Sequence, residues 1–267
     1  MDMKNTMKIL VLGHNGMLGN AVLKYFNDKK GYEVRTTNAR FGNPDFDTAL
    51  RETDAEVIIN AIGTIPQKKP PIADYQKLNV ELPRFLETLG KRIIHPSTDC
   101  EFRGNIAPGE KYTKTNIRDA EDVYGMSKAD SSREIEEHFK HTKIIRTSII
   151  GHELNSNLSL LDWFLAQQSE TRGYTNHLWN GITTLEWAKL AENLINSWDS
   201  APVLNQYGTA DNKSKFDLLL IVREVYGKDI SILPFETEVS FNKCLLSDLP
   251  LPSIQEQLEE LKSFYGK

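Results

Sequence analysis

The stretch Lys8-Ile9-Leu10-Val11-Leu12-Gly13-His14-Asn15-Gly16-Met17-Leu18-Gly19 decides how this chain folds. After Lys8, the four residues Ile9 to Leu12 form an apolar run, which predicts a buried strand, and glycines follow at positions 13, 16 and 19. Apolar residues then recur at helical spacing as far as Tyr25. A strand, a glycine turn and a helix in this order form the setting of a dinucleotide-binding loop.

The glycines of this loop would let the backbone approach a pyrophosphate, which then lies at the positive end of the following helix. The loop residues that we expect to bind a cofactor are Gly13, Asn15, Gly16, Met17, Leu18 and Gly19. Their spacing is G-x-x-G-x-x-G rather than G-x-G-x-x-G. The alternative is a tight turn between strand and helix that binds no ligand.

A second strand is expected at Glu33–Thr36. NAD-binding proteins usually carry an acid about 20 residues beyond the glycines, which binds the ribose 2′-hydroxyl. The segment from Thr36 to Arg40 contains no acid. Arg35 and Arg40 would instead meet a 2′-phosphate, so we expect NADP(H) to be favoured over NAD(H). The alternative is that both arginines are only solvated.

Three further apolar runs predict strands at Val57–Asn60, Arg92–Asp99 and Lys143–Ser148, with helices between them. One of these helices runs from about Asp74 to Leu89, and Pro83 must kink or break it. Alternating strands and helices of this length predict an α/β fold, a Rossmann-type doubly wound parallel sheet covered on both faces.

In such a sheet the ligands lie beyond the carboxyl ends of the strands. Residues that would let a cofactor lie across the end of the third strand are Asn60, Ala61, Ile62 and Gly63. The fourth strand ends in the polar residues Ser97, Thr98 and Asp99. Both groups therefore fall at the edge of the sheet where the glycine loop is expected.

Tyr124 and Lys128 stand four residues apart in Asp122-Val123-Tyr124-Gly125-Met126-Ser127-Lys128. If this stretch is helical, the two side chains share one face. An adjacent ammonium favours the phenolate and lowers the pKa of the phenol, which makes the tyrosine a usable acid. The spacing alone is common on helix surfaces, so its meaning depends on the other motifs.

The composition excludes several classes of protein. A net charge of -5 over 267 residues argues against a nucleic-acid surface, and no apolar run approaches the ~20 residues of a membrane span. The apolar run after Met1–Met7 is too short for a signal peptide. Cys100 and Cys244 make no disulfide framework, so a reducing cytoplasm is expected. His138 and His141 lack a third ligand, and no metal is expected.

Together these motifs resemble those of the extended short-chain dehydrogenase/reductases. Within that superfamily, Ser97-Thr98-Asp99-Cys100-Glu101-Phe102-Arg103-Gly104 is most similar to the Ser-Thr-Asp-Tyr-Val-Phe-Asp-Gly segment of the dTDP-4-dehydrorhamnose reductases. Arg146-Thr147-Ser148 and Asn180-Gly181-Ile182-Thr183 are similar to further stretches of that subfamily. The resemblance covers most of residues 7–195 and fades toward the C-terminus.

The resemblance implies an NAD(P)H-dependent reductase of a 4-keto, 6-deoxy nucleotide sugar in surface polysaccharide or deoxysugar biosynthesis. Tyr124 would protonate the substrate carbonyl oxygen as the nicotinamide delivers hydride, Lys128 would hold the nicotinamide ribose, and Thr98 would hydrogen-bond the same oxygen. Further substrate contacts are expected from Ser97, Asp99 and Cys100. The departures from the subfamily pattern, at Cys100, Glu101 and the loop Ile65–Pro71, bear on which sugar is bound more than on the chemistry.

Other members of this superfamily offer alternatives. Nucleotide-sugar dehydratases carry Thr-Asp-Glu, but here Cys100 follows Asp99, and Glu101 would point elsewhere on an extended chain. An epimerase remains an alternative, although epimerases usually show the acid that is missing after the second strand. A non-catalytic NADP-binding regulatory subunit is the alternative outside catalysis, and the presence of Tyr124, Lys128 and Thr98 argues against it.

We expect residues 1–150 to form the NADP(H)-binding domain with the catalytic residues, and residues 151–267 to form mainly a substrate-binding lobe interleaved with it. Helices are expected near Leu158–Phe164, from a capping box at Thr183–Glu186, at Phe216–Val225 and at Leu251–Tyr265. Arg172–Gly181 reads as a polar, aromatic loop suited to a nucleotide sugar. The candidate substrate residues in this half are Trp163, Arg172 and Asn180. A homodimer is one assembly compatible with the resemblance.

Overall fold

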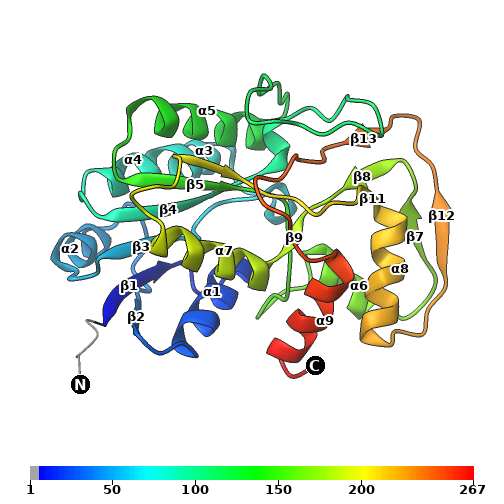
Figure 1. The fold of residues 1–267 in the computed structure, drawn as a ribbon, viewed down its shortest axis with the longest axis horizontal. Helices are drawn as coiled ribbons and strands as arrows, with labels where there is room; N and C mark the ends of the chain where they lie inside the picture. Colours follow the sequence, from blue (N-terminus) through cyan, green and yellow to red (C-terminus); the bar gives the residue numbers. More distant parts are fainter. Residues whose placement is uncertain (1–5) are drawn as a thin grey trace.

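A six-stranded parallel sheet forms the centre of the computed structural model, which describes residues 6–267 (Figure 1). In spatial order its strands are β10 (Leu204–Gln206), β5 (Thr142–Arg146), β4 (Arg92–Ser97), β3 (Val57–Asn60), β1 (Met7–Leu12) and β2 (Tyr32–Thr36). The chain progresses in opposite directions from β1, to β2 on one side and to β3 on the other. The ligand crevice of such a sheet lies at the carboxyl ends of those strands. The predicted α/β fold with a Rossmann-type parallel sheet is confirmed.

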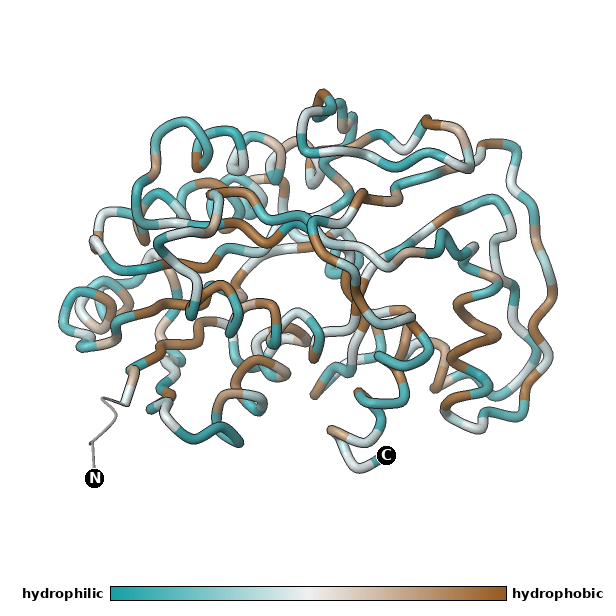
Figure 2. The backbone as a smooth tube through the Cα atoms, in the orientation of Figure 1, coloured by the Kyte–Doolittle hydropathy of each residue, from teal (hydrophilic) through white to brown (hydrophobic). Residues whose placement is uncertain are grey.

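Helices cover both faces of this sheet (Figure 1). One face is covered by α1 (Met17–Asn27) and α7 (Thr184–Asn196), and the other by α2 (Pro44–Glu52), α4 (Leu82–Glu87) and α5 (Val123–His138). Alternate residues of β1 supply the two cores, since Ile9 and Val11 lie in one cluster and Leu10 and Leu12 in the other. The colouring in Figure 2 is hydrophobic along these central strands and more hydrophilic along α5.

The helix predicted from Asp74 to Leu89 consists of α3 (Ile72–Gln76), a π-helical turn (Lys77–Glu81) and α4 in succession. Pro83 accounts for the wide turn, because proline has no N–H to donate and its ring crowds the carbonyl four residues earlier. The Leu82 amide instead donates to the Lys77 carbonyl, five residues back. The predicted disturbance at Pro83 is therefore a widening of the helix rather than a break.

The second half of the chain builds a smaller region beside the sheet, on the right in Figure 1. Its short strands pair as β6 (Ile149–Ile150) with β9 (Ile182–Thr183), β7 (Thr171–Tyr174) with β12 (Ile232–Phe235), and β8 (His177–Trp179) with β11 (Lys213–Ser214) and β13 (Phe241–Asn242). Its helices are α6 (Leu160–Ala166), α8 (Lys215–Tyr226) and α9 (Ile254–Phe264). The helices expected in this half are therefore present, and the side chain of Thr183 caps α7 as predicted.

The prediction of a loop over Arg172–Gly181 is wrong, because this segment contains β7 and β8. These strands are four and three residues long and pair with segments much later in the chain. No local alternation of apolar and polar residues marks strands this short. The sequence interpretation also left out α2 and β10.

The predicted domain boundary near residue 150 stays a prediction. Residues from beyond it return to the central sheet, because β10 pairs with β5 and α7 packs in the same core cluster as α1. The interpretation of Met1–Met7 falls mostly outside the described residues. Within residues 6–267, no helix combines the length and the apolar character needed to cross a bilayer.

Candidate active site

The glycine loop lies directly against the segment that follows β3. Gly13 has a φ of 75°, and a Cβ added there would stand 2.7 Å from the Ala61 carbonyl oxygen. A Cβ at Gly19 would collide with the Gly13 carbonyl, so only glycine lets α1 pass this close to the loop. The Ala61 amide in turn donates to the Leu12 carbonyl at 3.0 Å. The two predicted cofactor segments, Gly13–Gly19 and Asn60–Gly63, therefore meet at the crevice.

The N-terminus of α1 is suited to an anion. Within residues 6–267, no side chain caps this helix at Gly16, and its first turn carries no acid. The first backbone amides thus present the positive end of an 11-residue helix. The residues present therefore fit the pyrophosphate of a dinucleotide.

The position of Arg35 corrects an expectation. Its guanidinium pairs with Glu33 and, at 2.8 Å, with Asp54, which also accepts from Lys8 Nζ at 2.6 Å. Asp54 precedes β3 and Lys8 lies near the start of β1, so this cluster gathers at the amino ends of the strands. Arg35 is therefore turned away from the crevice and is not placed to meet a 2′-phosphate. Arg40 is exposed in the segment after β2, and its role stays a prediction.

Tyr124 and Lys128 lie in the first turns of α5, as predicted. The Asp122 side chain caps the helix by accepting from the Gly125 amide at 2.9 Å. A Cβ at Gly125 would collide with the Cys100 carbonyl, so glycine lets α5 lie close against the turn that follows β4. The N-terminus of α5 is therefore held at the carboxyl end of β4, on the same edge of the sheet as the glycine loop.

The pKa of Tyr124 lies well above its ordinary value, contrary to the sequence-based expectation. Burial is the largest cause, and Cys100 and Asp99 act in the same direction. The neighbouring Thr98 side chain acts the other way and lowers the pKa. The expected lowering by Lys128 is wrong for this structure, because the lysine amine is directed toward β4.

Lys128 is buried, and its Nζ donates to the Pro96 carbonyl at 2.7 Å. The same nitrogen lies 3.1 Å from His95 Nε2. Burial lowers the pKa of Lys128 to about 8, and the negative charge of Glu101 opposes that shift. Burial and the neighbouring Lys128 lower the pKa of His95 well below its ordinary value, so the imidazole is neutral.

The turn after β4 brings together three of the predicted substrate and catalytic residues. Thr98 Oγ1 donates to Asp99 Oδ1 at 3.0 Å and accepts from the Cys100 amide at 3.1 Å. Burial raises the pKa of the Cys100 thiol to about 12, so it stands as a small neutral side chain. Ser97 has the opposite orientation, since its buried hydroxyl donates to Glu101. The position of Ser97 therefore gives no support to the expected substrate contact.

Glu101 anchors a buried cluster of charges beneath this turn. Its Oε2 lies 2.6 Å from Arg146 Nη2 and 2.8 Å from Arg118 Nε, and its Oε1 accepts from Ser97 and Ser132. Glu101 and Arg146 have fully buried side chains. The prediction that Glu101 points away from the substrate side agrees with this, although the segment is a 3₁₀ turn (Asp99–Glu101) rather than extended chain.

Asn79 is a site residue that sequence reasoning missed. It lies in the π-helical turn, where its Oδ1 accepts from the Thr64 amide at 3.2 Å and its Nδ2 donates to Ser127 Oγ at 3.0 Å. Asn79 therefore ties the chain that follows Gly63 to α5. The available signal was Pro83, because a proline four residues later loosens the helix at this position.

The three candidates in the second half are placed as follows. The side-chain amide of Asn180 hydrogen-bonds to backbone groups: it donates to the Thr209 and Leu245 carbonyls and accepts from the Leu245 amide. These contacts occupy the amide, so Asn180 is not placed to bind a sugar. Trp163 packs against the hydrophobic core that contains α1 and α7. Arg172 is exposed on β7, with its guanidinium 5.3 Å from the centre of the Phe235 ring. The roles predicted for Trp163 and Arg172 stay predictions.

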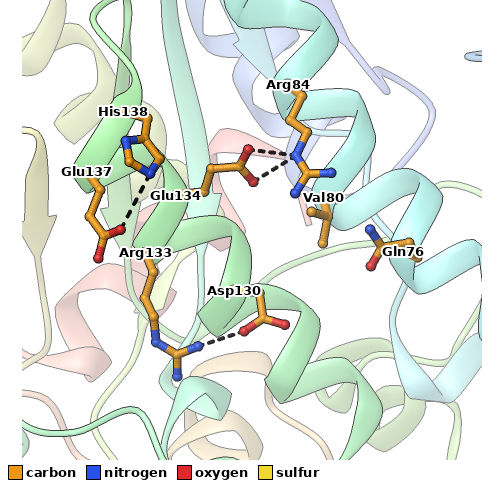
Figure 3. Close-up of a pocket in the computed structure, with 8 residues that line it drawn as sticks. All are labelled: Gln76, Val80, Arg84, Asp130, Arg133, Glu134, Glu137 and His138. Carbon is orange, nitrogen blue, oxygen red and sulfur yellow. Dashed lines mark hydrogen bonds and ion pairs between the residues drawn. The ribbon is translucent and has the colours of Figure 1, made fainter.

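A cavity of about 440 Å³ lies on the outer side of α5 (Figure 3). Its charged side chains pair with one another, as Arg84 does with Glu134 and Arg133 with Asp130. The face of α5 that carries Tyr124 and Lys128 is a different one, so this cavity is separate from the site. Among residues 6–267, no three His, Cys, Asp or Glu side chains come together as metal ligands.

The parallel sheet, the glycine loop and the Tyr124–Lys128 pair on α5 define the class of a short-chain dehydrogenase/reductase. Residues 7–171 match the model of the RmlD substrate binding domain family. The chain belongs to this family.

Three proteins that are similar to this chain are named dTDP-4-dehydrorhamnose reductase. A dTDP-4-dehydrorhamnose reductase from Aggregatibacter actinomycetemcomitans is 29% identical over 160 residues, which cover 56% of this chain and 54% of that protein. The chain thus spans about half the length of this curated relative. Crystal structures of dTDP-4-dehydrorhamnose reductases from Clostridium acetobutylicum and, in complex with NADP, from Bacillus anthracis have TM-scores of 0.82 and 0.83. Their identities are 20% and 17%, and each comparison covers 98% of this chain and 100% of the other.

Proposed function

We propose that this chain is an NAD(P)H-dependent reductase of a 4-keto, 6-deoxy nucleotide sugar, active in surface polysaccharide or deoxysugar biosynthesis. One observation carries the proposal: α5 holds Tyr124 against the turn that bears Thr98, on the edge of the sheet where the glycine loop lies. The names of the related reductases and the NADP in one of their structures support it.

A nicotinamide nucleotide at the glycine loop would supply the hydride. The Tyr124 hydroxyl gives its proton to the substrate carbonyl oxygen, where negative charge develops. The Thr98 hydroxyl hydrogen-bonds the same oxygen and fixes its position. Lys128 binds the nicotinamide ribose. Asp99 and Cys100 stand next to Thr98 in the same turn and contact the sugar.

The test is NADPH consumption by the purified protein with a panel of 4-keto nucleotide sugars, followed by mass spectrometry of the products. We expect reduction of at least one 4-keto-6-deoxy sugar. Tight NADPH binding without turnover of any sugar would indicate the regulatory subunit instead. Release of an epimer with retained NAD would indicate the epimerase.

We propose that NADPH binds more tightly than NADH, and that Arg40 provides the preference. Arg40→Ala should weaken NADPH binding roughly 10–150-fold, the size of a charged hydrogen bond, and leave NADH binding unchanged. Arg35→Ala is the matched control, because its guanidinium is held by Glu33 and Asp54. Isothermal titration calorimetry measures both nucleotides, and equal dissociation constants for the wild type would refute the preference.

The cytoplasm as the site of action and a homodimer as the assembly remain proposals. Cell fractionation tests the first, and light scattering on the purified protein tests the second.

A further inference from the structure

A buried chain of side chains connects the cofactor segment to the catalytic helix. Asn60 ends β3, His95 lies in β4 and Lys128 lies in α5, and their exposed fractions are 0%, 1% and 6%. Asn60 Nδ2 lies 3.2 Å from His95 Nδ1, and His95 Nε2 lies 3.1 Å from Lys128 Nζ. The imidazole therefore stands between the amide and the amine.

The backbone fixes which end of the Asn60 amide faces His95. The Ile62 amide is a donor, and it lies 3.1 Å from Asn60 Oδ1. The Nδ2 donor of Asn60 consequently faces His95 Nδ1, which must accept. A neutral imidazole that accepts at Nδ1 carries its hydrogen on Nε2. His95 therefore presents an N–H to Lys128.

This N–H faces the Lys128 amine, which also donates to the Pro96 carbonyl. A neutral amine satisfies both contacts, because its lone pair accepts from His95 while one of its hydrogens goes to Pro96. An ammonium has no lone pair, so two donors would face each other across 3.1 Å. The buried geometry thus disfavours a proton on Lys128.

We propose that His95 is a positioning residue that sets the proton affinity of Lys128, because Asn60 holds its imidazole in the Nε2–H form. The importance of this effect for catalysis rests on the proposed reductase function. With a pKa of about 8, Lys128 stays mostly protonated at neutral pH, but its proton is easier to pass to the Tyr124 phenolate than that of an ordinary lysine.

The other charged groups near Lys128 come from three elements. Glu101 in the 3₁₀ turn favours the ammonium, but its carboxylate is paired with Arg118 and with Arg146 of β5. Asp99 lies in the same turn, and Tyr124 lies one turn earlier on α5. Because Glu101 is already paired, the contact with His95 is the immediate one at the amine.

The experiment is an NMR titration of the nucleotide-free protein. Carbon-13 at Lys Cε reports the charge of each amine, and the Lys128 signal is the one lost in Lys128→Arg. We expect its midpoint near pH 8 in the wild type. His95→Gln places an amide oxygen that can accept from the ammonium, so the midpoint should rise by about one pH unit, the size of one hydrogen bond. His138→Gln, on the exposed end of α5, is the control that should leave it unchanged.

Asn60→Asp gives a second, independent test. A carboxylate accepts from both the Ile62 amide and His95 Nδ1, which moves the imidazole hydrogen to Nδ1 and turns Nε2 into an acceptor for the ammonium. The Lys128 midpoint should again rise by about one unit. In a His95→Leu background, Asn60→Asp should lose at least half of that shift, because the connecting ring is gone.

Nitrogen-15 spectra of the histidine rings read the tautomer of His95 directly in the wild type, so the test stands even if a variant fails to fold. An Nδ1–H form would overturn the proposal, as would unchanged midpoints in folded His95→Gln and Asn60→Asp. All these measurements are made without nucleotide or sugar. A protein that shows the expected midpoints but reduces no sugar would refute only the proposed function.

Discussion

Tyr124→Phe is expected to lower kcat by about 10²–10⁴-fold and to leave NADPH affinity largely unchanged, because general acid catalysis acts only as charge develops on the substrate oxygen. The raised pKa of Tyr124 fits a group that holds its proton until the reaction. Steady-state kinetics with a 4-keto nucleotide sugar measure kcat, and fluorescence titration measures NADPH binding. A variant that keeps more than about a tenth of the wild-type kcat would show that Tyr124 is not the proton donor.

Two variants serve as comparisons for Tyr124→Phe. Lys128→Ala should lower kcat and also weaken NADPH binding, because Lys128 is proposed to touch the ribose. Thr98→Val should cost less than Tyr124→Phe, since it removes an orienting hydrogen bond and not the proton. Identical effects of all three variants on both parameters would contradict these separate roles.

Glu101→Ala is expected to lower the free energy of unfolding by about 3–5 kcal/mol. It would leave the fully buried guanidinium of Arg146 without the carboxylate that lies 2.6 Å away. Urea denaturation of the purified variant measures this loss. Because Glu101 also accepts from Ser97 and Ser132, two buried hydroxyls would lose a partner as well.

Glu121→Ala is the matched control for Glu101→Ala. Glu121 pairs with Arg103 at 2.8 Å, but its side chain is 65% exposed, so about 0–1 kcal/mol is expected. Replacing Arg146 by Met in the Glu101→Ala background should recover part of the loss, since no unpaired guanidinium then remains buried. A loss below 1 kcal/mol for Glu101→Ala would show that Arg146 finds another partner.

The parts of the fold that local sequence determines were predictable. The strand residues Ile9 to Leu12 are buried on both faces of the sheet and therefore form a continuous apolar run in the sequence. Gly13 and Gly19 marked the turn, and the spacing of Tyr124 and Lys128 placed both residues on α5. The strands β7 and β8 were missed because their partners lie far along the chain.

The candidate site was predictable where the residue type alone sets the chemistry. It was not predictable where neighbouring residues determine the orientation and the hydrogen bonds of a side chain. Arg35 has the right charge for a phosphate, but Asp54, 19 residues later, turns it away. Asn180 has the right polarity for a sugar, but backbone groups use all its contacts. His95 gave no signal, because its importance comes from Asn60 and Lys128 on two other elements.

The pairing of β10 with β5 constrains the synthesis of the chain. β5 ends at Arg146, but the strand that covers its free edge begins only at Leu204. At roughly 5–20 residues per second, a ribosome needs several seconds to deliver that strand. During this interval the amides and carbonyls of β5 form an open edge that other nascent chains can pair with. A folding catalyst or chaperone would therefore matter most after β5 has been synthesised and before β10 has been synthesised.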